Sequence, residues 1–558
     1  MHASLQRTSG AFRRQTHARR RKSSRSQGNA AQIFVQYHYP EFLGSFQPLS
    51  VRDPQMTFQA TAPSVRPAGI ATRYLQTLRR RDFLAGAALV DGRWFSEGER
   101  EHVIDPATGE RIADVARCSA TEMELAIASA ERSFPAWREL LPARRGAALR
   151  AWASLMLDHA EDLAILVTSE QGKPLAEARQ EIAYAAAFLD WFAAEGERSY
   201  GETIPSHKAG SLLQVRMQPV GLAAAITPWN FPVAMITRKA GAALAAGCPI
   251  IVKPAPETPL SALALARLAE QAGFPPGVLQ VLVGDPIELS GPLLSDTRIR
   301  ALSFTGSTEV GRLLLKGAAE SVKKVSLELG GHAPFLVFDD VDVGKAVKGA
   351  IAAKFATSGQ DCLAANRIYV QRSIYNAFVD EFAAAIAGLK VGHGLEPSTD
   401  IGPMTTLSVA QKCRAQIDDA TQRGARVFSP NQEAALGPHF VAPTLLSDAT
   451  EEMLIAREET FGPVAAVLPF DSEEEVIARA NANEMGLAGY VYTDSLRRAL
   501  RLSEQIECGM LGVNTASFTG PPIPFGGWKQ SGLGREGSRH GLAEYMELKY
   551  VCFGDLAV

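Results

Sequence analysis

The sequence predicts an α/β protein with two lobes, each built on a parallel sheet. In residues 221–318, short apolar runs typical of buried strands alternate with runs that have helical spacing. This alternation indicates βαβ units, because parallel strands need a long crossover that a helix usually supplies. Residues 325–492 repeat the pattern, which predicts a second α/β lobe. Residues 122–195 have the Ala- and Leu-rich spacing of helices that cover another layer.

The composition indicates a globular protein of two or three domains. The chain has 558 residues, of which 46% are hydrophobic and 21% are charged. No uncharged apolar run reaches the ~18 residues that cross a bilayer, so we expect a soluble protein without membrane contact. The six cysteines show neither metal-ligand spacing nor a paired framework, which predicts free thiols, a reducing compartment and no metal site. A net charge of −3 gives no general reason to expect nucleic acid.

The first residues differ from the rest of the chain. Residues 1–40 contain no Asp or Glu, although Arg and Lys are frequent against a Ser- and Gln-rich background. Such a segment cannot bury a core, so residues 1–75 are predicted to form a disordered basic extension. Its composition fits an organelle transit peptide, a tail that contacts nucleic acid or acidic membrane, or a dispensable extension upstream of Met56. We therefore expect a cytoplasmic protein, or a mitochondrial one if the segment is a transit peptide.

Three polar segments follow predicted strands of the first lobe. They are Thr227-Pro-Trp-Asn230, Lys253-Pro254 and Thr305-Gly-Ser307. In a parallel sheet, ligands lie beyond the carboxyl ends of the strands, so these segments are expected to converge on one crevice. The glycines of Gly306–Gly311 begin a helix after a strand, where backbone N–H groups could hold a phosphate. The spacing is not G-x-G-x-x-G, and Gly306 and Gly311 fit turn and packing roles equally well.

Cys362 is a candidate nucleophile in the second lobe. It lies in the polar stretch Ser358–Arg367, directly after the apolar run Ala350–Phe355. This position is typical of a side chain at the end of an element that faces a cleft, where small-molecule sites are expected. The alternative is a buried structural thiol, because free cysteine often behaves as a small hydrophobe.

Nine short motifs occur in a fixed order between Asp82 and Phe553. They are Asp105-Pro-Ala-Thr-Gly-Glu, Glu170-Gln-Gly-Lys-Pro-Leu, Thr227-Pro-Trp-Asn-Phe-Pro, Lys253-Pro, Phe304-Thr-Gly-Ser, Glu328-Leu-Gly-Gly, Gly359-Gln-Asp-Cys, Glu458-Glu-Thr-Phe-Gly-Pro-Val and Pro524-Phe-Gly-Gly-Trp-Lys-Gln-Ser-Gly-Leu-Gly-Arg-Glu. Together they resemble the aldehyde dehydrogenase superfamily, and most closely its succinate-semialdehyde dehydrogenase branch.

The resemblance implies an aldehyde dehydrogenase-like α/β fold of three parts. A Rossmann-like NAD(P)-binding domain is expected over residues 76–199 and 220–329, and an α/β catalytic domain over residues 330–535. A β oligomerisation arm is expected over residues 200–219 and 536–558, through which the family forms dimers or tetramers. A terminal strand in such an arm would otherwise be an unpaired edge, so a homodimer or homotetramer is expected.

The resemblance also implies NAD(P)-dependent oxidation of an aldehyde to the acid through a cysteine thiohemiacetal and thioester. Cys362 matches the nucleophile and needs an electropositive setting to ionise. The Asn230 amide and the Cys362 backbone N–H match the donors to the oxyanion. Glu328 matches the general base that activates water. Lys239 and Glu536 match a proton relay, with surface ion pairing as the alternative for each.

The cofactor implied is NAD or NADP. The positions that match the family's cofactor site are Trp229, Lys253, Pro256, Gly306, Ser307, Gly311, Leu329, Glu459 and Phe461. Lys253 matches the contact to the adenosine ribose, and Glu459 and Phe461 match the ligand and wall of the nicotinamide ribose. Many NAD-preferring relatives have Glu where this chain has Pro256. That Glu repels a 2′-phosphate, so we expect NADP to be at least tolerated.

The substrate is expected to be succinate semialdehyde or a similar semialdehyde. Arg238 matches an arginine that binds a distal carboxylate in that branch, and Thr519 offers a hydroxyl. Ala356 and Ala364 depart from the branch, which has a second Arg and a second Cys there. Three alternatives remain: another small aldehyde as substrate, a CoA-acylating enzyme, which Glu328 disfavours, and a non-catalytic binding protein of this fold.

Overall fold

The structure is a computed structural model that describes residues 69–430 and 436–556. Most of the predicted disordered extension lies outside these residues. Its last positions, Ile70–Leu75, form helix α1, of which Ala71 and Leu75 are buried. No helix in the described ranges is both long and apolar enough to cross a membrane.

The first lobe is an eight-stranded sheet with the order β2-β1-β9-β8-β7-β10-β11-β21. The strands are β1 (Ala88–Val90), β2 (Arg93–Phe95), β7 (Leu222–Ile226), β8 (Ile250–Lys253), β9 (Leu279–Val281), β10 (Ile299–Thr305), β11 (Lys324–Glu328) and β21 (Gly532–Leu533). The five strands from β9 to β11 pair in parallel, and β1, β2 and β21 join in antiparallel pairs. Every residue of β7 and β8 is buried, as expected for a parallel sheet covered on both faces.

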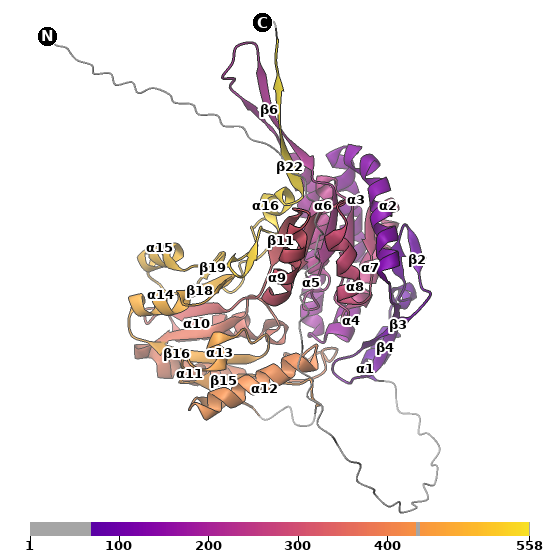
Figure 1. Cartoon of the computed structure of the whole chain (residues 1–558). Helices are drawn as coiled ribbons and strands as arrows, with labels where there is room; N and C mark the ends of the chain where they lie inside the picture. Colours follow the sequence, from indigo (N-terminus) through magenta and orange to yellow (C-terminus); the bar gives the residue numbers. More distant parts are fainter. Residues whose placement is uncertain (1–68, 431–435, 557–558) are drawn as a thin grey trace, which may run out of the picture. The chain divides into compact units, whose positions relative to one another are not determined.

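Helices cover both faces of this sheet (Figure 1). One core contains residues of α2 (Ala120–Glu139), α8 (Pro286–Ser295) and α9 (Thr308–Ala319). The other contains residues of α3 (Pro142–Asp158), α4 (Ala160–Gln171), α5 (Leu175–Glu195), α6 (Ala234–Ala246) and α7 (Pro259–Gln271). The hairpin of β3 (Arg100–Ile104) and β4 (Arg111–Ala116) is separate from the sheet.

The second lobe is a seven-stranded sheet with the order β14-β15-β16-β13-β12-β18-β19. Its strands are β12 (Ala333–Val337), β13 (Ala365–Gln371), β14 (Arg426–Phe428), β15 (Thr444–Ser447), β16 (Val464–Phe470), β18 (Ala488–Tyr492) and β19 (Met510–Val513). All neighbours pair in parallel except β14 and β15. A two-stranded ladder of β17 (Met485–Gly486) and β20 (Trp528–Lys529) lies outside this sheet. The predicted α/β fold with two parallel sheets is confirmed.

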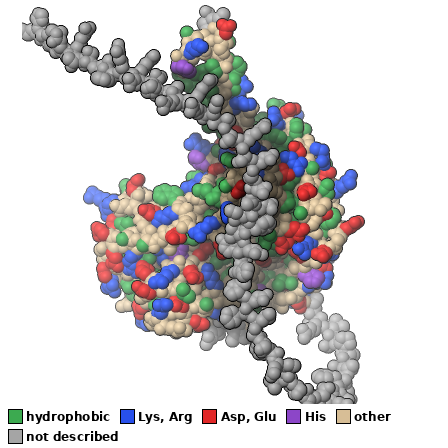
Figure 2. All heavy atoms as spheres, in the orientation of Figure 1, with side chains coloured by type: hydrophobic (Ala, Val, Ile, Leu, Met, Phe, Trp, Pro, Cys, Tyr) green, Lys and Arg blue, Asp and Glu red, His purple; other side chains and the backbone are tan. Residues whose placement is uncertain are grey.

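Two helical layers also cover the second sheet. One core includes residues of α10 (Val343–Phe355) and α11 (Tyr375–Ala387). The other includes residues of α12 (Leu407–Gln422), α13 (Leu454–Arg457), α14 (Glu473–Asn481) and α15 (Leu496–Gln505). Acidic and basic side chains are mixed over the face of the molecule that Figure 2 shows.

A three-stranded antiparallel sheet projects from the first lobe (Figure 1). It is formed by β5 (Glu202–Ile204), β6 (Leu212–Pro219) and β22 (Met546–Phe553), which follows α16 (Ser538–Ala543). Leu548 and Tyr550 of β22 are exposed. β21 falls within the range given to the catalytic domain but pairs with β11 of the first sheet. The domain boundaries themselves stay a prediction.

Candidate active site

Cys362 lines two cavities at once. One has a volume of about 310 Å³ and is lined by residues of α5, α6 and the segment after α10. The other has a volume of about 230 Å³ and is lined by the segments that follow β7, β10, β11 and α13. The thiol therefore faces a space on each side, as a nucleophile between two bound molecules would.

A strained turn carries Cys362. Thr357, Ser358 and Gly359 all have left-handed backbone conformations, with φ of 50°, 56° and 75°. A residue other than glycine in this region costs ~1–3 kcal/mol, so other contacts must hold the turn. The Glu177 carboxylate accepts from Thr357 N–H at 2.9 and 3.0 Å, and Ser358 Oγ accepts from Gly402 N–H at 2.8 Å. These contacts fix the direction in which the thiol points.

The surroundings of the Cys362 thiol disfavour its ionisation. Burial raises the pKa of Cys362 well above its ordinary value, and the neighbouring Asp361 carboxylate raises it further, while Arg238 acts in the opposite direction. The electropositive setting expected for this thiol is thus not supplied by the balance of these neighbours. Something that binds in a cavity must help the proton to leave.

A buried brace holds Asn230, which follows β7. Lys173 Nζ donates to the Asn230 carbonyl at 2.7 Å and to Glu181 Oε2 at 2.6 Å. Glu181 Oε1 in turn accepts from Val233 N–H at 2.9 Å. The Asn230 amide donates to the Gln360 carbonyl at 3.1 Å, which places it beside the segment that carries Cys362. We call Lys173 and Glu181 the Asn230 brace. No sequence pattern indicated that Lys173 and Glu181 hold Asn230, although Lys173 lies in the motif Glu170-Gln-Gly-Lys-Pro-Leu.

Glu328 ends β11 and is buried, and neither carboxylate oxygen has a hydrogen-bond partner among the described residues. Burial raises its pKa well above the ordinary value, and the charge of Glu536 adds to this effect. Burial opposes the ionisation of Glu536 as well, but Lys239 and Arg238 outweigh it and lower the Glu536 pKa. Lys239 Nζ also donates to Thr305 Oγ1 at 2.7 Å. The surroundings therefore favour the neutral form of Glu328 and the ionised form of Glu536.

Surface ion pairing of Lys239 and Glu536 is ruled out. Their exposed fractions are 1% and 4%, and their side chains contact each other inside the protein. Arg238 Nη2 lies 2.9 Å from Glu536 Oε2, so the two cations share one carboxylate. The three residues thus form a buried cluster next to Glu328.

The smaller cavity is lined by two aromatic side chains and a carboxylate. Trp229 and Phe461 meet edge to face with ring centroids 5.4 Å apart and give it aromatic walls. Glu459 lines it and accepts from Gly331 N–H at 3.0 Å, and burial raises its pKa to about 7. Leu329 lines the same space. A carboxylate between flat apolar walls suits a ribose and its attached ring, so these residues fit the cofactor.

The glycines after β10 have packing roles. Ser307 caps α9, because its hydroxyl accepts from Val310 N–H at 3.3 Å. A Cβ at Gly306 would lie 2.4 Å from the Phe304 ring, and one at Gly311 would lie 2.4 Å from the Leu329 side chain. The packing alternative therefore explains both positions. Gly306 and Ser307 also line the smaller cavity, whereas Gly311 does not.

Lys253, at the end of β8, is 2% exposed. Burial lowers its pKa to about 8, and the nearby Glu257 carboxylate opposes this shift. Glu257 follows Pro256 directly, so a carboxylate is present beside Lys253 although Pro256 supplies none. The family motif drew attention to position 256 alone, so the carboxylate of Glu257 beside Lys253 was not predicted from the sequence.

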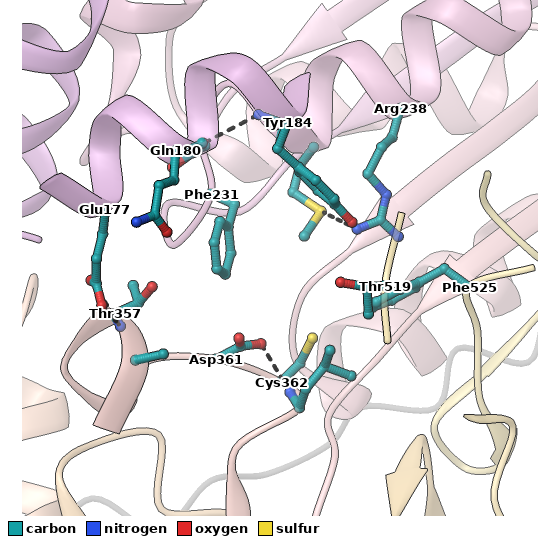
Figure 3. Close-up of a pocket in the computed structure, with 15 residues that line it drawn as sticks. Glu177, Gln180, Tyr184, Phe231, Arg238, Thr357, Asp361, Cys362, Thr519 and Phe525 are labelled. Carbon is teal, nitrogen blue, oxygen red and sulfur yellow. Dashed lines mark hydrogen bonds between the residues drawn. The ribbon is translucent and has the colours of Figure 1, made fainter. Parts of the chain in front are cut away.

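The larger cavity brings the two predicted substrate residues together and adds others. Arg238 and Thr519 line it, and the Arg238 guanidinium stacks on the Phe525 ring 3.9 Å from its centroid (Figure 3). Glu177 and Asp361 line the same cavity. In the sequence, the one sign that Asp361 belongs to the site is its position directly before the candidate nucleophile Cys362. No sequence signal indicated that Glu177 lines this cavity. No group of three or more His, Cys, Asp or Glu among the described residues could hold a metal ion.

Comparisons with known proteins show the family to which the chain belongs. A profile of the aldehyde dehydrogenase family matches residues 94–551. The chain is 53% identical to a protein of Halomonas elongata named aspartate-semialdehyde dehydrogenase (non-phosphorylating), over 84% of this chain and 96% of that protein. It is 50% identical to the NADP-specific succinate-semialdehyde dehydrogenase of Escherichia coli, over 84% of this chain and 97% of that protein. The crystal structure of an aldehyde dehydrogenase from Brucella melitensis biovar abortus 2308 matches with a TM-score of 0.84 and 50% identity, covering 86% of this chain and 99% of that one.

Proposed function

Because the chain belongs to the aldehyde dehydrogenase family, whose members use NAD or NADP, we propose that it oxidises a short semialdehyde to the carboxylic acid. The candidates are succinate semialdehyde and similar semialdehydes that also carry a carboxylate tail. The observation that carries the proposal is the position of Cys362 in the lining of two cavities, one with Trp229, Phe461 and Glu459 in its walls and the other with Arg238. A small aldehyde in the larger cavity would meet the thiol from the side opposite to the nicotinamide.

The reaction begins at the Cys362 sulfur. The thiol loses its proton, and the sulfur forms a bond to the aldehyde carbon, so that the carbonyl oxygen becomes an oxyanion. The Asn230 amide, held by the Asn230 brace, and the Cys362 backbone N–H are the donors proposed to stabilise that charge. NAD or NADP, when bound, would supply the hydride acceptor, and loss of the hydride from the same carbon would leave a thioester on Cys362.

Hydrolysis then needs a base, and Glu328 is the proposed one. Its raised pKa suits a group that accepts a proton from water near neutral pH. Water attacks the thioester carbon, the carbon–sulfur bond breaks, and the acid leaves. Lys239 and Glu536, buried next to Glu328, form the proposed route by which its proton returns to solvent.

Arg238 is the reason to expect a semialdehyde. It lines the larger cavity, and a guanidinium suits a distal carboxylate. The relatives named for aspartate, glutarate and succinate semialdehydes support the same class, since all three of these aldehydes have a carboxylate tail. Ala356 lines the same cavity and offers no second cation.

A panel of aldehydes tests the proposal. The protein is assayed with succinate semialdehyde, glutarate semialdehyde and butyraldehyde, with NAD and with NADP, and the product is identified as free acid or acyl-CoA in the presence of CoA. We expect reduced cofactor and free acid, and loss of both in Cys362→Ala. Arg238→Ala should raise KM more for succinate semialdehyde than for butyraldehyde. A folded protein that reduces neither cofactor with any aldehyde would overturn the proposed function, and an acyl-CoA product would assign the CoA-acylating activity.

The exposed strand β22 supports a homodimer or homotetramer. Leu548 is 70% exposed and Tyr550 is 55% exposed, on a strand that pairs with β6 on one edge only. Such an edge is proposed to dock on a second copy of the chain. Light scattering at several protein concentrations measures the mass, and a monomer at all of them would exclude this role.

A further inference from the structure

The larger cavity is lined by the carboxylates of Glu177 and Asp361, which would repel a substrate tail whose only charge is a carboxylate. Figure 3 shows Glu177 and Asp361 on one side of the cavity and Arg238 and Thr519 on the other. Neither carboxylate forms an ion pair with any described residue. Lys173, whose charge acts to lower the pKa of both carboxyls, is paired with Glu181 at 2.6 Å. Arg238, which acts in the same direction on Asp361, is paired with Glu536 at 2.9 Å.

The charge of Asp361 opposes the ionisation of Glu177 in the same cavity. Burial raises the pKa of Glu177 to about 7, and the charge of Asp361 contributes to that rise. Burial also raises the pKa of Asp361, one oxygen of which accepts from Leu363 N–H at 3.0 Å. Each carboxylate therefore accepts a hydrogen bond from a backbone N–H group, and neither is paired with a cation among the described residues. Two such groups in one small space are stabilised by a ligand that brings a positive charge.

Arg238 gives an independent indication of a ligand in the same cavity. It is 2% exposed, and its Nε has no hydrogen-bond partner among the described residues. Its charge is already met by Glu536 at 2.9 Å, so it can add hydrogen bonds to a carboxylate but little net charge. A substrate tail with only a carboxylate would meet an Arg238 that is already paired with Glu536. It would also face Glu177 and Asp361, which have no ion-pair partner among the described residues.

We propose that the substrate's tail carries an ammonium group held by Glu177 and Asp361 together with a carboxylate bound at Arg238, as in an α-amino-acid semialdehyde. This inference rests on the proposed function and names the substrate class within it. The cavity, about 310 Å³, is large enough for a four- or five-carbon chain. The acids and the guanidinium line the same cavity, so a tail that carries an ammonium and a carboxylate has a partner there for each charge.

Four short aldehydes separate the contributions of the two charges. Aspartate semialdehyde has both, succinate semialdehyde has the carboxylate alone, 3-aminopropionaldehyde has the ammonium alone, and butyraldehyde has neither. We expect wild-type kcat/KM to be at least tenfold higher for aspartate semialdehyde than for succinate semialdehyde. Asp361→Asn and Glu177→Gln should each lower that ratio by about tenfold, which is about 1.4 kcal/mol. The ratio cancels any general effect of the substitution on Cys362.

Asp190→Asn is the matched control. It removes one negative charge from the outer face of the same helix, α5, where Asp190 is 72% exposed, and should leave the ratio unchanged. A wild-type preference for succinate semialdehyde, or a ratio that Asp361→Asn and Glu177→Gln leave unchanged, would overturn the proposal. The wild-type comparison decides it even if a variant does not fold. Turnover of none of the four aldehydes would instead overturn the proposed function and this inference with it.

Discussion

The Asn230 brace and the space around Cys362 both contain buried charge, but they pair it differently. In the brace, Lys173 and Glu181 meet at 2.6 Å, and both also bind backbone atoms. Around Cys362, the carboxylates of Asp361 and Glu328 have no ion-pair partner in the part of the chain that the structure describes, and their pKa values are raised. Paired charges hold a shape, whereas unpaired acids can exchange a proton or meet an incoming ligand. The difference separates positioning residues from residues that face the reaction.

Glu328→Gln tests the unpaired side and should give the largest effect. The amide keeps the shape of Glu328 but cannot accept a proton, so hydride transfer should continue while thioester hydrolysis slows. We expect a burst of reduced cofactor close to one equivalent per site, followed by turnover lowered about 10²- to 10⁴-fold. Stopped-flow absorbance measures both phases. Wild-type turnover in this variant would remove Glu328 from the mechanism.

Lys173→Met tests the paired side. It leaves the buried Glu181 carboxylate without its cation, which should lower the free energy of unfolding by about 3 kcal/mol. Urea unfolding at one fixed protein concentration measures the loss. The double variant Lys173→Met/Glu181→Gln is the control and should lose less, because no unpaired charge remains. If both variants lost the same free energy of unfolding, the unpaired charge of Glu181 would not be the cause of the loss.

Lys253 and Glu257 form an intermediate case, because the cation is buried and its acidic neighbour is half-buried. With Pro256 in place of an acid, we expect NADP to be used, with NAD preferred by less than a hundredfold, or ~2.7 kcal/mol. Pro256→Glu should raise the NAD/NADP ratio of kcat/KM by about tenfold, and Glu257→Gln should lower it, since negative charge repels the 2′-phosphate. The saturation kinetics of both cofactors measure the ratio. No change in either variant would show that the ribose lies elsewhere.

Asp361→Asn should move the pH profile without a large loss of activity. The Asp361 carboxylate raises the pKa of Cys362, so its removal favours the thiolate at lower pH. The rising limb of kcat/KM for butyraldehyde, an uncharged substrate, should therefore shift to lower pH. Initial rates across the pH range measure this limb. A shift to higher pH would mean that Asp361 helps to remove the thiol proton.

The sequence by itself determined the fold class and the family. Alternating strand and helix patterns are local, and they predicted the two parallel sheets that the structure confirms. The motifs around Asn230, Glu328 and Cys362 are short and ordered, so their resemblance to aldehyde dehydrogenases could be recognised without coordinates. Their chemical roles stay predictions until the variants are measured.

Only the tertiary structure decided how the charges are paired and buried. Lys239 and Glu536 are 297 positions apart in the chain, and no local pattern shows that they share a buried ion pair. Glu177 lies in an ordinary helical stretch, yet it reaches the turn before Cys362, 180 positions away. The physical reason is that hydrophobic periodicity and motif spacing are properties of neighbours along the chain. Desolvation and ion pairing depend on which distant segments the fold brings together.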